Sequence, residues 1–148
     1  MKMKTAVFPG SFDPFTIGHK NIVERALKLF DKVIIAIGVN SNKKPLFPVD
    51  ERINAIKKCF SAEKNVEVES YEGLTVDFCK KKNANFIVRG IRNGSDFLFE
   101  QEIAQVNADL APGIETVFLA TAPELSYISS TVVRELYLNG GDYKRFLP

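Results

Sequence analysis

The chain's single histidine, His19, ends the stretch GSFDPFTIGH, which spans residues 10–19. The stretch follows an apolar run and precedes a helical pattern of apolar residues. Thr16 can cap that helix, which places Gly18 and His19 in its first turn. Free N–H groups at a helix start attract an anion, and an imidazole there adds a further donor. An ordinary strand–helix turn with a surface histidine explains the same residues equally well.

Basic side chains follow two other apolar runs. Lys43 and Lys44 form a short basic pair, whose ordinary interpretation is two solvated charges. Arg89 directly follows an apolar run, so its guanidinium starts near the core and needs a partner. Phosphate oxygens match its planar fork, and the carboxylate of Asp96 or Glu100 would serve as well.

Arg92 stands three residues further on and has the same alternatives. Glu100 lies one turn into the next helical pattern and could instead accept a hydrogen bond from a ribose. The stretch SYISSTVVRE, residues 126–135, offers a run of hydroxyls at a helix start. Simple capping by Ser129 or Ser130 explains one hydroxyl, and three in succession also favour phosphate binding.

Several other chemistries are excluded by missing patterns. The sequence has no GxGxxG, no GxxxxGK[ST] and no GxSxG, and one histidine does not allow a Ser–His–Asp triad. Cys59 and Cys79 lie far apart in helical patterns and are expected to be reduced core or half-buried thiols, and with one histidine they make no metal-ligand cluster. What remains is phosphate chemistry that relies on positioning and charge.

Alternating strand and helix patterns must position these groups. Strands are expected at residues 5–8, 32–39, 66–69, 85–90 and 115–120, and helices at 20–30, 50–60, 74–82, 96–110 and 129–138. Asp50 is expected to cap the second helix. The helix at 96–110 has the clearest period, because its apolar residues recur every three or four positions.

This alternation predicts an α/β fold, a Rossmann-like doubly wound five-stranded parallel sheet in a single domain over residues 1–148. In such a sheet ligands bind outside the carboxyl ends of the strands. The segments that leave the predicted strands are 9–19, 40–48, 71–75, 89–96 and 121–131. They carry the histidine, lysines, arginines and hydroxyls described above, so these groups are expected to gather at one rim around a polyphosphate ligand.

Bulk properties narrow the class of partner. The net charge is only +2, which gives no strong case for nucleic acid or an anionic membrane. No apolar run approaches the length of a membrane span. The initial MKMKTAVF is interrupted too soon by Pro9 and Gly10 to be a signal peptide. A cytoplasmic protein is therefore expected.

The motifs resemble a known enzyme family. Residues 10–19 look like the T/HxGH motif of the nucleotidyltransferase superfamily, and ISSTVVR, 128–134, resembles its ISSTxxR motif. RGIRNGSDFLFE, 89–100, is similar to the RGxRxxxDFxYE segment of bacterial phosphopantetheine adenylyltransferases. SNKKPLF, 41–47, and EGLTVDF, 72–78, match the remaining loops of that family. The resemblance covers essentially the whole chain.

The resemblance implies a reaction in which the adenylyl group of ATP passes to 4′-phosphopantetheine, giving dephospho-coenzyme A and pyrophosphate. It implies in-line attack with electrostatic stabilisation and no covalent intermediate. It also implies Mg²⁺ held mainly by phosphates and water, a homohexamer, coenzyme A as a feedback inhibitor, and the strand order 3-2-1-4-5.

The resemblance also assigns roles to residues of this sequence. The catalytic residues would be His19, Lys43 and Arg92. Phosphopantetheine would be held by Ser11, Lys43, Thr75 and Arg89. ATP would be held by Ser11, Phe12, His19, Gly90, Ile91, Arg92, Glu100, Leu125, Ser126, Tyr127, Ile128, Ser129, Ser130 and Thr131.

Three features depart from the family pattern. Phe99 and Phe8 stand where tyrosine is usual, and the sequence ends at FLP, 146–148, where many relatives continue into another helix. Rival functions are a nicotinate or nicotinamide mononucleotide adenylyltransferase, a cytidylyltransferase, a non-catalytic nucleotide sensor on the same fold, and a flavodoxin-like binding module.

Overall fold

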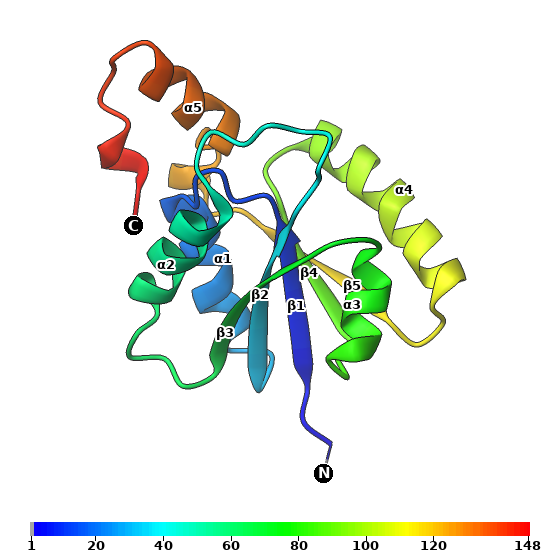
Figure 1. The fold of residues 1–148 in the computed structure, drawn as a ribbon. Coiled ribbons are helices and arrows are strands. Elements are labelled where there is room, and N and C mark those ends of the chain that lie inside the picture. Colours follow the sequence, from blue (N-terminus) through cyan, green and yellow to red (C-terminus); the bar gives the residue numbers. More distant parts are fainter. Residues whose placement is uncertain (1) are drawn as a thin grey trace.

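Five parallel strands form one sheet in the order β3-β2-β1-β4-β5, shown in Figure 1. They are β1 (Thr5–Gly10), β2 (Lys32–Gly38), β3 (Val66–Tyr71), β4 (Phe86–Ile91) and β5 (Glu115–Ala120). The structure is a computed structural model and describes residues 2–148. The predicted fold class and strand order are confirmed.

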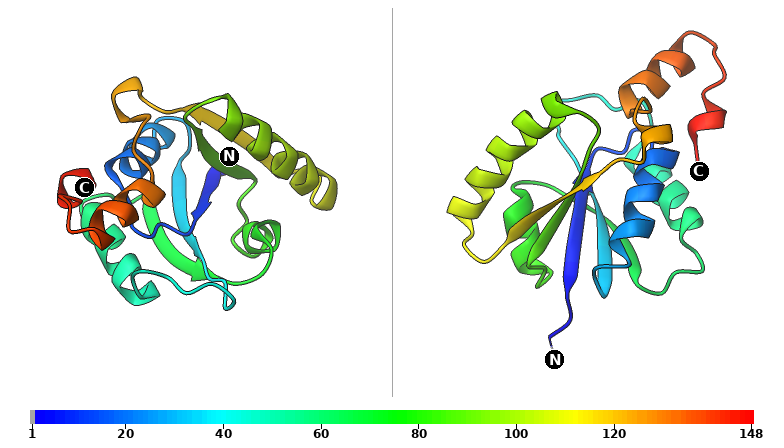
Figure 2. Two further views of the ribbon diagram at one scale, coloured as in Figure 1. Left: turned by 90° about the horizontal axis from the view of Figure 1, so that it is seen from above. Right: turned by 180° about the vertical axis from the view of Figure 1, so that it is seen from behind.

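The helices cover both faces of the sheet. They are α1 (Ile17–Ala26), α2 (Val49–Cys59), α3 (Thr75–Lys81), α4 (Gly94–Leu110) and α5 (Ser130–Leu138). Figure 2 shows α1 and α2 on one side and α3 and α4 on the other. None of the helices described is long and apolar enough to cross a membrane.

The interior position of β2, between β3 and β1, explains why its sequence is a continuous β-branched run. Val33, Ile35 and Ile37 pack into the core beneath α1 and α2. Ile34 and Ala36 point the other way, into the core beneath α3. Because alternate side chains face opposite layers, every position from Val33 to Ile37 is apolar. By contrast, β3 lies at the edge of the sheet, as its mixed sequence predicts.

Helix boundaries differ from the predictions in ways that capping explains. The apolar pattern of α1 starts only at residue 20, but the helix begins at Ile17, because Thr16 is its N-cap as predicted. The prediction that Asp50 caps α2 is wrong: Pro48 holds that position, and Asp50 lies in the first turn, where a carboxylate favours the helix dipole. α4 begins at Gly94, because the Asn93 side chain accepts a hydrogen bond from the backbone of Asp96.

Both cysteines are free, as predicted: Cys79 is buried and Cys59 is half-buried.

The period of α4 predicts its helical structure correctly, but its stripe of apolar side chains is exposed rather than packed on the sheet. Its exposed fractions are 64% at Phe99, 41% at Ile103 and 57% at Val106.

Candidate active site

Two neighbouring strands separate at the edge where the site lies. β1 pairs with β2 along its whole length, but with β4 only at Ala6 and Val7. Beyond this point Pro9 has no N–H to donate, and the Arg89 guanidinium on β4 donates to the Pro9 carbonyl instead. The strand order reverses between β1 and β4, and such a switch point is where open parallel sheets bind ligands.

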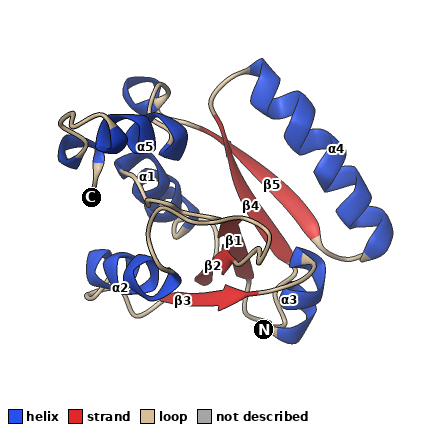
Figure 3. Cartoon of the chain, turned by 45° about the horizontal axis from the view of Figure 1, so that its top comes forward, coloured by secondary structure: helices blue, strands red, loops and turns tan. Residues whose placement is uncertain are grey.

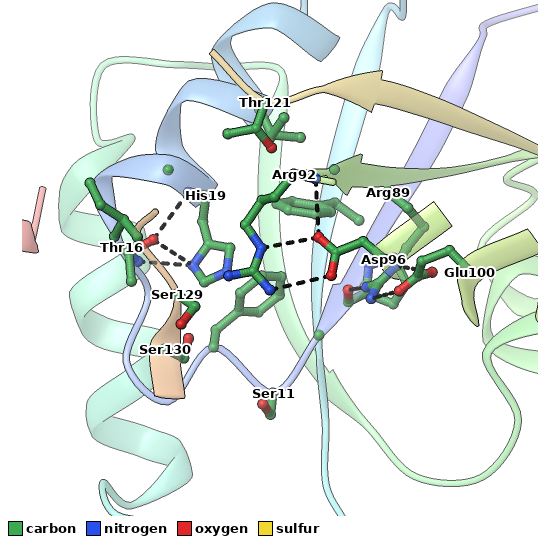
Figure 4. Close-up of a pocket in the computed structure, with 18 residues that line it drawn as sticks. Ser11, Thr16, His19, Arg89, Arg92, Asp96, Glu100, Thr121, Ser129 and Ser130 are labelled. Carbon is green, nitrogen blue, oxygen red and sulfur yellow. Dashed lines mark hydrogen bonds and ion pairs between the residues drawn. The ribbon is translucent and has the colours of Figure 1, made fainter. Parts of the chain in front are cut away.

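A cavity of about 260 Å³ opens at this switch point. Figure 3, with the top of the molecule tilted forward, shows loops crossing above the carboxyl end of β1. The side chains that line the cavity come from the β1–α1 loop, the end of β4, the start of α4 and the segment after β5 (Figure 4). Among the predicted site residues it is lined by Ser11, Phe12, His19, Arg89, Gly90, Arg92, Glu100, Ile128, Ser129 and Ser130.

His19 is locked in place by a reciprocal cap with Thr16. The Thr16 backbone N–H donates to His19 Nδ1 at 2.9 Å, and the His19 backbone N–H donates to the Thr16 hydroxyl at 3.3 Å. The rings of Phe12 and Phe15 pack on the imidazole with centroids 5.0 and 5.3 Å away. Because Nδ1 accepts a hydrogen bond, the proton of the neutral ring sits on Nε2.

The environment of His19 keeps the imidazole neutral. Burial of the ring, followed by the positive charges of Arg89 and Arg92, lowers the pKa of His19 from 6.5 to about 3. Near pH 7 the ring therefore carries no charge and holds its Nε2 proton. It can donate a hydrogen bond, but it is a poor general base and is not protonated for use as a general acid.

Arg92 lies beside the imidazole in Figure 4. Its Nε and Nη2 donate to the two oxygens of Asp96 at 3.1 and 3.3 Å. Asp96 also accepts from the Arg92 backbone N–H at 3.0 Å. Of the two carboxylates that the sequence offers this arginine, Asp96 is therefore the one it pairs with.

Arg89 makes a stronger pair with Glu100. Its Nε and Nη2 donate to the two carboxylate oxygens at 2.8 and 2.6 Å, and Glu100 is 8% exposed. With the bond to Pro9, three of the five guanidinium N–H groups are used. Arg89 also lines a second cavity, next to Thr75, so it lies between two cavities.

The hydroxyl run at the start of α5 has structural roles that account for two of its members. Ser129 is the N-cap and accepts from the Val132 N–H at 3.2 Å. Ser130 donates to the Pro14 carbonyl at 2.8 Å, which ties this segment to the β1–α1 loop. Both residues line the cavity, so the N-terminal end of α5 faces it.

The comparisons with known proteins agree with this architecture. The cytidylyltransferase-like family model matches residues 7–136. The phosphopantetheine adenylyltransferase of Flavobacterium psychrophilum is 53% identical over 146 residues, which covers 99% of this chain and 96% of that protein. That of Christiangramia forsetii is 51% identical over 146 residues, with the same shares covered.

The chain belongs to the phosphopantetheine adenylyltransferase family. It is accordingly an enzyme of the nucleotidyltransferase type. The family predicted from the motifs is confirmed. A bifunctional NMN adenylyltransferase/ADP ribose pyrophosphatase from Francisella tularensis has the same fold, with a TM-score of 0.75 and 21% identity over 99% of this chain and 45% of that chain. At that identity the likeness shows the fold alone.

Some residues that the family resemblance predicts lie outside the first cavity. Lys43 lines a cleft of about 400 Å³ together with Ser11. Thr75 lines the second cavity together with Arg89. The remaining ones, which are not among the residues that line the first cavity, are Ile91, Leu125, Ser126, Tyr127 and Thr131.

The two phenylalanines that stand where the family usually has tyrosine lie in different surroundings. Phe99 is 64% exposed, whereas Phe8 is buried against Phe12 with ring centroids 5.1 Å apart. Gly10 is needed because a Cβ there would lie 2.8 Å from the Phe12 ring. Thr121 also lines the cavity, although the sequence did not single it out as a site residue. It is the first residue after β5, so it lies at the carboxyl end of a strand, where ligands of parallel sheets bind.

Proposed function

We propose that the protein transfers the adenylyl group of ATP to 4′-phosphopantetheine, giving dephospho-coenzyme A and pyrophosphate. The observation that carries the proposal is identity of about half, over 99% of the chain, to proteins named phosphopantetheine adenylyltransferase. The cavity supports it, because its donors suit phosphate groups and its one histidine is held neutral.

This reaction requires stabilisation of the charge that grows on the α-phosphate, and it does not require removal of a proton from the nucleophile. A phosphate oxygen of phosphopantetheine, already ionised near neutral pH, attacks the α-phosphorus of ATP. One P–O bond forms as the bond to the β-phosphate breaks, and pyrophosphate leaves with the electron pair. The neutral His19 suits this chemistry, because its Nε2–H can donate to the α-phosphate oxygen where charge grows.

The carboxylate-paired arginines limit how ATP can bind. Arg89 and Arg92 are each neutralised by a carboxylate, so the cavity is less cationic than its sequence suggests. The Arg92 pair is the weaker one, with longer bonds and greater exposure. We therefore assign Arg92 to the triphosphate, which would replace Asp96 as its partner. Arg89 would keep Glu100 and offer its two remaining N–H groups.

The acceptor has a separate place in this scheme. Ser11 lines both the first cavity and the Lys43 cleft, and Arg89 lines both the first cavity and the Thr75 cavity. Phosphopantetheine would lie with its phosphate near Ser11, Lys43 and Arg89, and extend past Thr75. The attacking oxygen then approaches the α-phosphate from the side opposite the departing pyrophosphate.

Mg²⁺ belongs to the proposal as a ligand of the substrates. Within residues 2–148 no group of three or more His, Cys, Asp or Glu side chains is placed to bind a metal ion. The two carboxylates that line the cavity, Asp96 and Glu100, accept from arginines. The ion would therefore bind mainly to phosphate oxygens and water, where it would offset charge on the leaving pyrophosphate.

The assembly and regulation expected of the family complete the proposal. A homohexamer would cover the exposed apolar stripe of α4 with other copies of the chain. Coenzyme A, which contains the product's pantetheine and adenylyl parts, would inhibit by occupying the same cavities. A cytoplasmic location would supply the ATP that the reaction consumes.

The experiment that tests this function compares acceptors and donors under one assay of pyrophosphate release. We expect steady release with ATP and 4′-phosphopantetheine, and product with the mass of dephospho-coenzyme A. We expect none with nicotinate or nicotinamide mononucleotide as acceptor, and none when CTP replaces ATP. Turnover with a mononucleotide but not with phosphopantetheine would overturn the proposal, as would ATP binding without turnover on any of these acceptors.

A further inference from the structure

Asp13 joins two loops that are far apart in the sequence. It lies between β1 and α1, and it is 7% exposed. Its Oδ2 accepts from the Leu46 backbone N–H at 2.7 Å, and its Oδ1 accepts from that of Phe47 at 2.9 Å. These amides belong to the segment 40–48, which follows β2 and carries Lys43. Both oxygens of one buried carboxylate are therefore directed at this segment.

Two arginines hold the same junction from other helices. Arg52, on α2 and 7% exposed, donates from Nε to the Phe47 carbonyl at 2.9 Å and from Nη1 to the Ser11 carbonyl at 2.6 Å. Arg134, on α5, donates to the Asp13 carbonyl at 2.9 Å. Phe47 is thus held at its N–H by Asp13 and at its carbonyl by Arg52. None of these three polar side chains lines the first cavity, whereas all three line the Lys43 cleft.

Apart from the Phe47 ring, which packs on Tyr137 of α5 with ring centroids 5.3 Å apart, the segment that carries Lys43 has little other support. Ser41, Asn42, Lys43, Lys44 and Pro45 are all exposed. Figure 1 shows the segment arching from the end of β2 over the top of the sheet to α2. Among the described residues, the side-chain hydrogen bonds that reach it from outside come from Asp13 and Arg52. Its position relative to the β1–α1 loop therefore depends on these bonds.

We propose that Asp13 is a positioning residue, which fixes the segment 40–48 against the β1–α1 loop and so sets Lys43 relative to His19. The inference rests on the proposed function, in which Lys43 meets the phosphate of the acceptor and His19 meets that of ATP. Asp13 lines the Lys43 cleft, but both of its carboxylate oxygens already accept backbone N–H groups, so it acts on the acceptor through the segment that it holds. Its loss should impair the use of phosphopantetheine and leave the binding of ATP largely intact.

The variant Asp13→Asn tests this selectivity. Asparagine keeps one acceptor oxygen and turns an NH₂ group toward the second backbone N–H, so one of the two bonds is lost. We expect the KM for phosphopantetheine to rise about tenfold, the effect of losing one hydrogen bond to a charged group. The KM for ATP should stay within about twofold of the wild-type value. The matched control is Asp50→Asn, which removes the same charge from an exposed site near the same segment.

A double substitution asks whether Asp13 acts through Lys43. In a Lys43→Ala background, Asp13→Asn should add almost nothing to the KM for phosphopantetheine, because the side chain it positions is gone. Multiplying effects would overturn the inference, as would equal rises in both KM values. Arg52→Gln, which releases Phe47 from its other side, should give the same selective rise and serves if Asp13→Asn folds poorly.

Amide hydrogen exchange tests the structural part without any assumption about substrates. Exchange at Leu46 and Phe47 should accelerate in Asp13→Asn and remain slow in Asp50→Asn, with the amides of α1 unchanged in both. Unchanged exchange at the two amides would overturn the inference. If the wild-type enzyme showed no adenylyl transfer, the proposed function would be contradicted instead. The exchange rates would still test whether Asp13 holds the amides of Leu46 and Phe47.

Discussion

At the scale of single residues, one Thr–His pair both starts a helix and prepares a donor for chemistry. The sequence predicts Thr16 as a cap and His19 in the first helical turn, and the structure confirms both. It does not predict that Nδ1 accepts the Thr16 N–H, because that bond depends on the side-chain rotamer. Yet this bond decides that Nε2 carries the proton.

The neutral state of His19 has a consequence for stability. Its folded pKa of about 3 lies below the unfolded value of 6.5, so between these pH values the unfolded chain binds a proton that the folded chain does not. The folded state is therefore favoured fully above pH 6.5 and loses this advantage as the pH falls toward 3. The slope is at most about 1.4 kcal/mol per pH unit.

We predict that wild-type protein loses more stability on acidification than His19→Gln, which has no imidazole to protonate. The measurement is the free energy of urea unfolding at pH 7.5 and at pH 5.0 for both proteins. The carboxylates are present in both proteins and cancel in the comparison, and no other imidazole titrates because His19 is the chain's single histidine. Equal losses of stability in the two proteins would mean that the imidazole is protonated as easily in the folded state as in the unfolded chain.

At the scale of elements, helix α4 carries both a site residue and an unpartnered face. Glu100 points from its first turns to Arg89 on β4, while the stripe through Phe99, Ile103 and Val106 is exposed. The period of this stripe predicts the helix but not what covers it, because periodicity reports an apolar face whatever its partner. The choice of a carboxylate partner for Arg89 likewise depends on how α4 packs beside β4.

We predict that Val106→Asp lowers the mass of the assembled protein in solution, because it puts a charge on the stripe that other copies would cover. Gln105→Asp, one residue away and also exposed, places the same charge beside the stripe and should leave the mass unchanged. Light scattering after size-exclusion chromatography measures both. An unchanged mass for Val106→Asp would remove α4 from the subunit interface.

At the scale of the whole molecule, the site exists because the chain folds its strand ends to one edge. The rule for parallel sheets predicts that His19, Arg89 and Arg92 meet there, and all three line one cavity. Lys43 and Thr75 lie at the same edge but line neighbouring clefts. Sequence reasoning could not separate these clefts, because the course of a loop depends on tethers such as Asp13 and Arg52.

The sequence also does not predict that β1 and β4 separate after Val7. Pro9 shows where β1 loses a donor, but not that the Arg89 guanidinium takes over its carbonyl from the neighbouring strand. That contact closes the gap between the strands beneath the cavity. The cavity and its central arginine are therefore one structural feature, formed by the point at which the sheet reverses its order.

The central claim is that the Nε2–H of His19 stabilises the α-phosphate during transfer. The most direct test is the single-turnover rate of dephospho-coenzyme A formation by wild type and by His19→Ala, with the Kd for ATP measured in parallel. We predict a fall of roughly a hundredfold or more, corresponding to about 3–4 kcal/mol, with ATP binding largely unchanged. A near-normal rate in the variant would contradict the account.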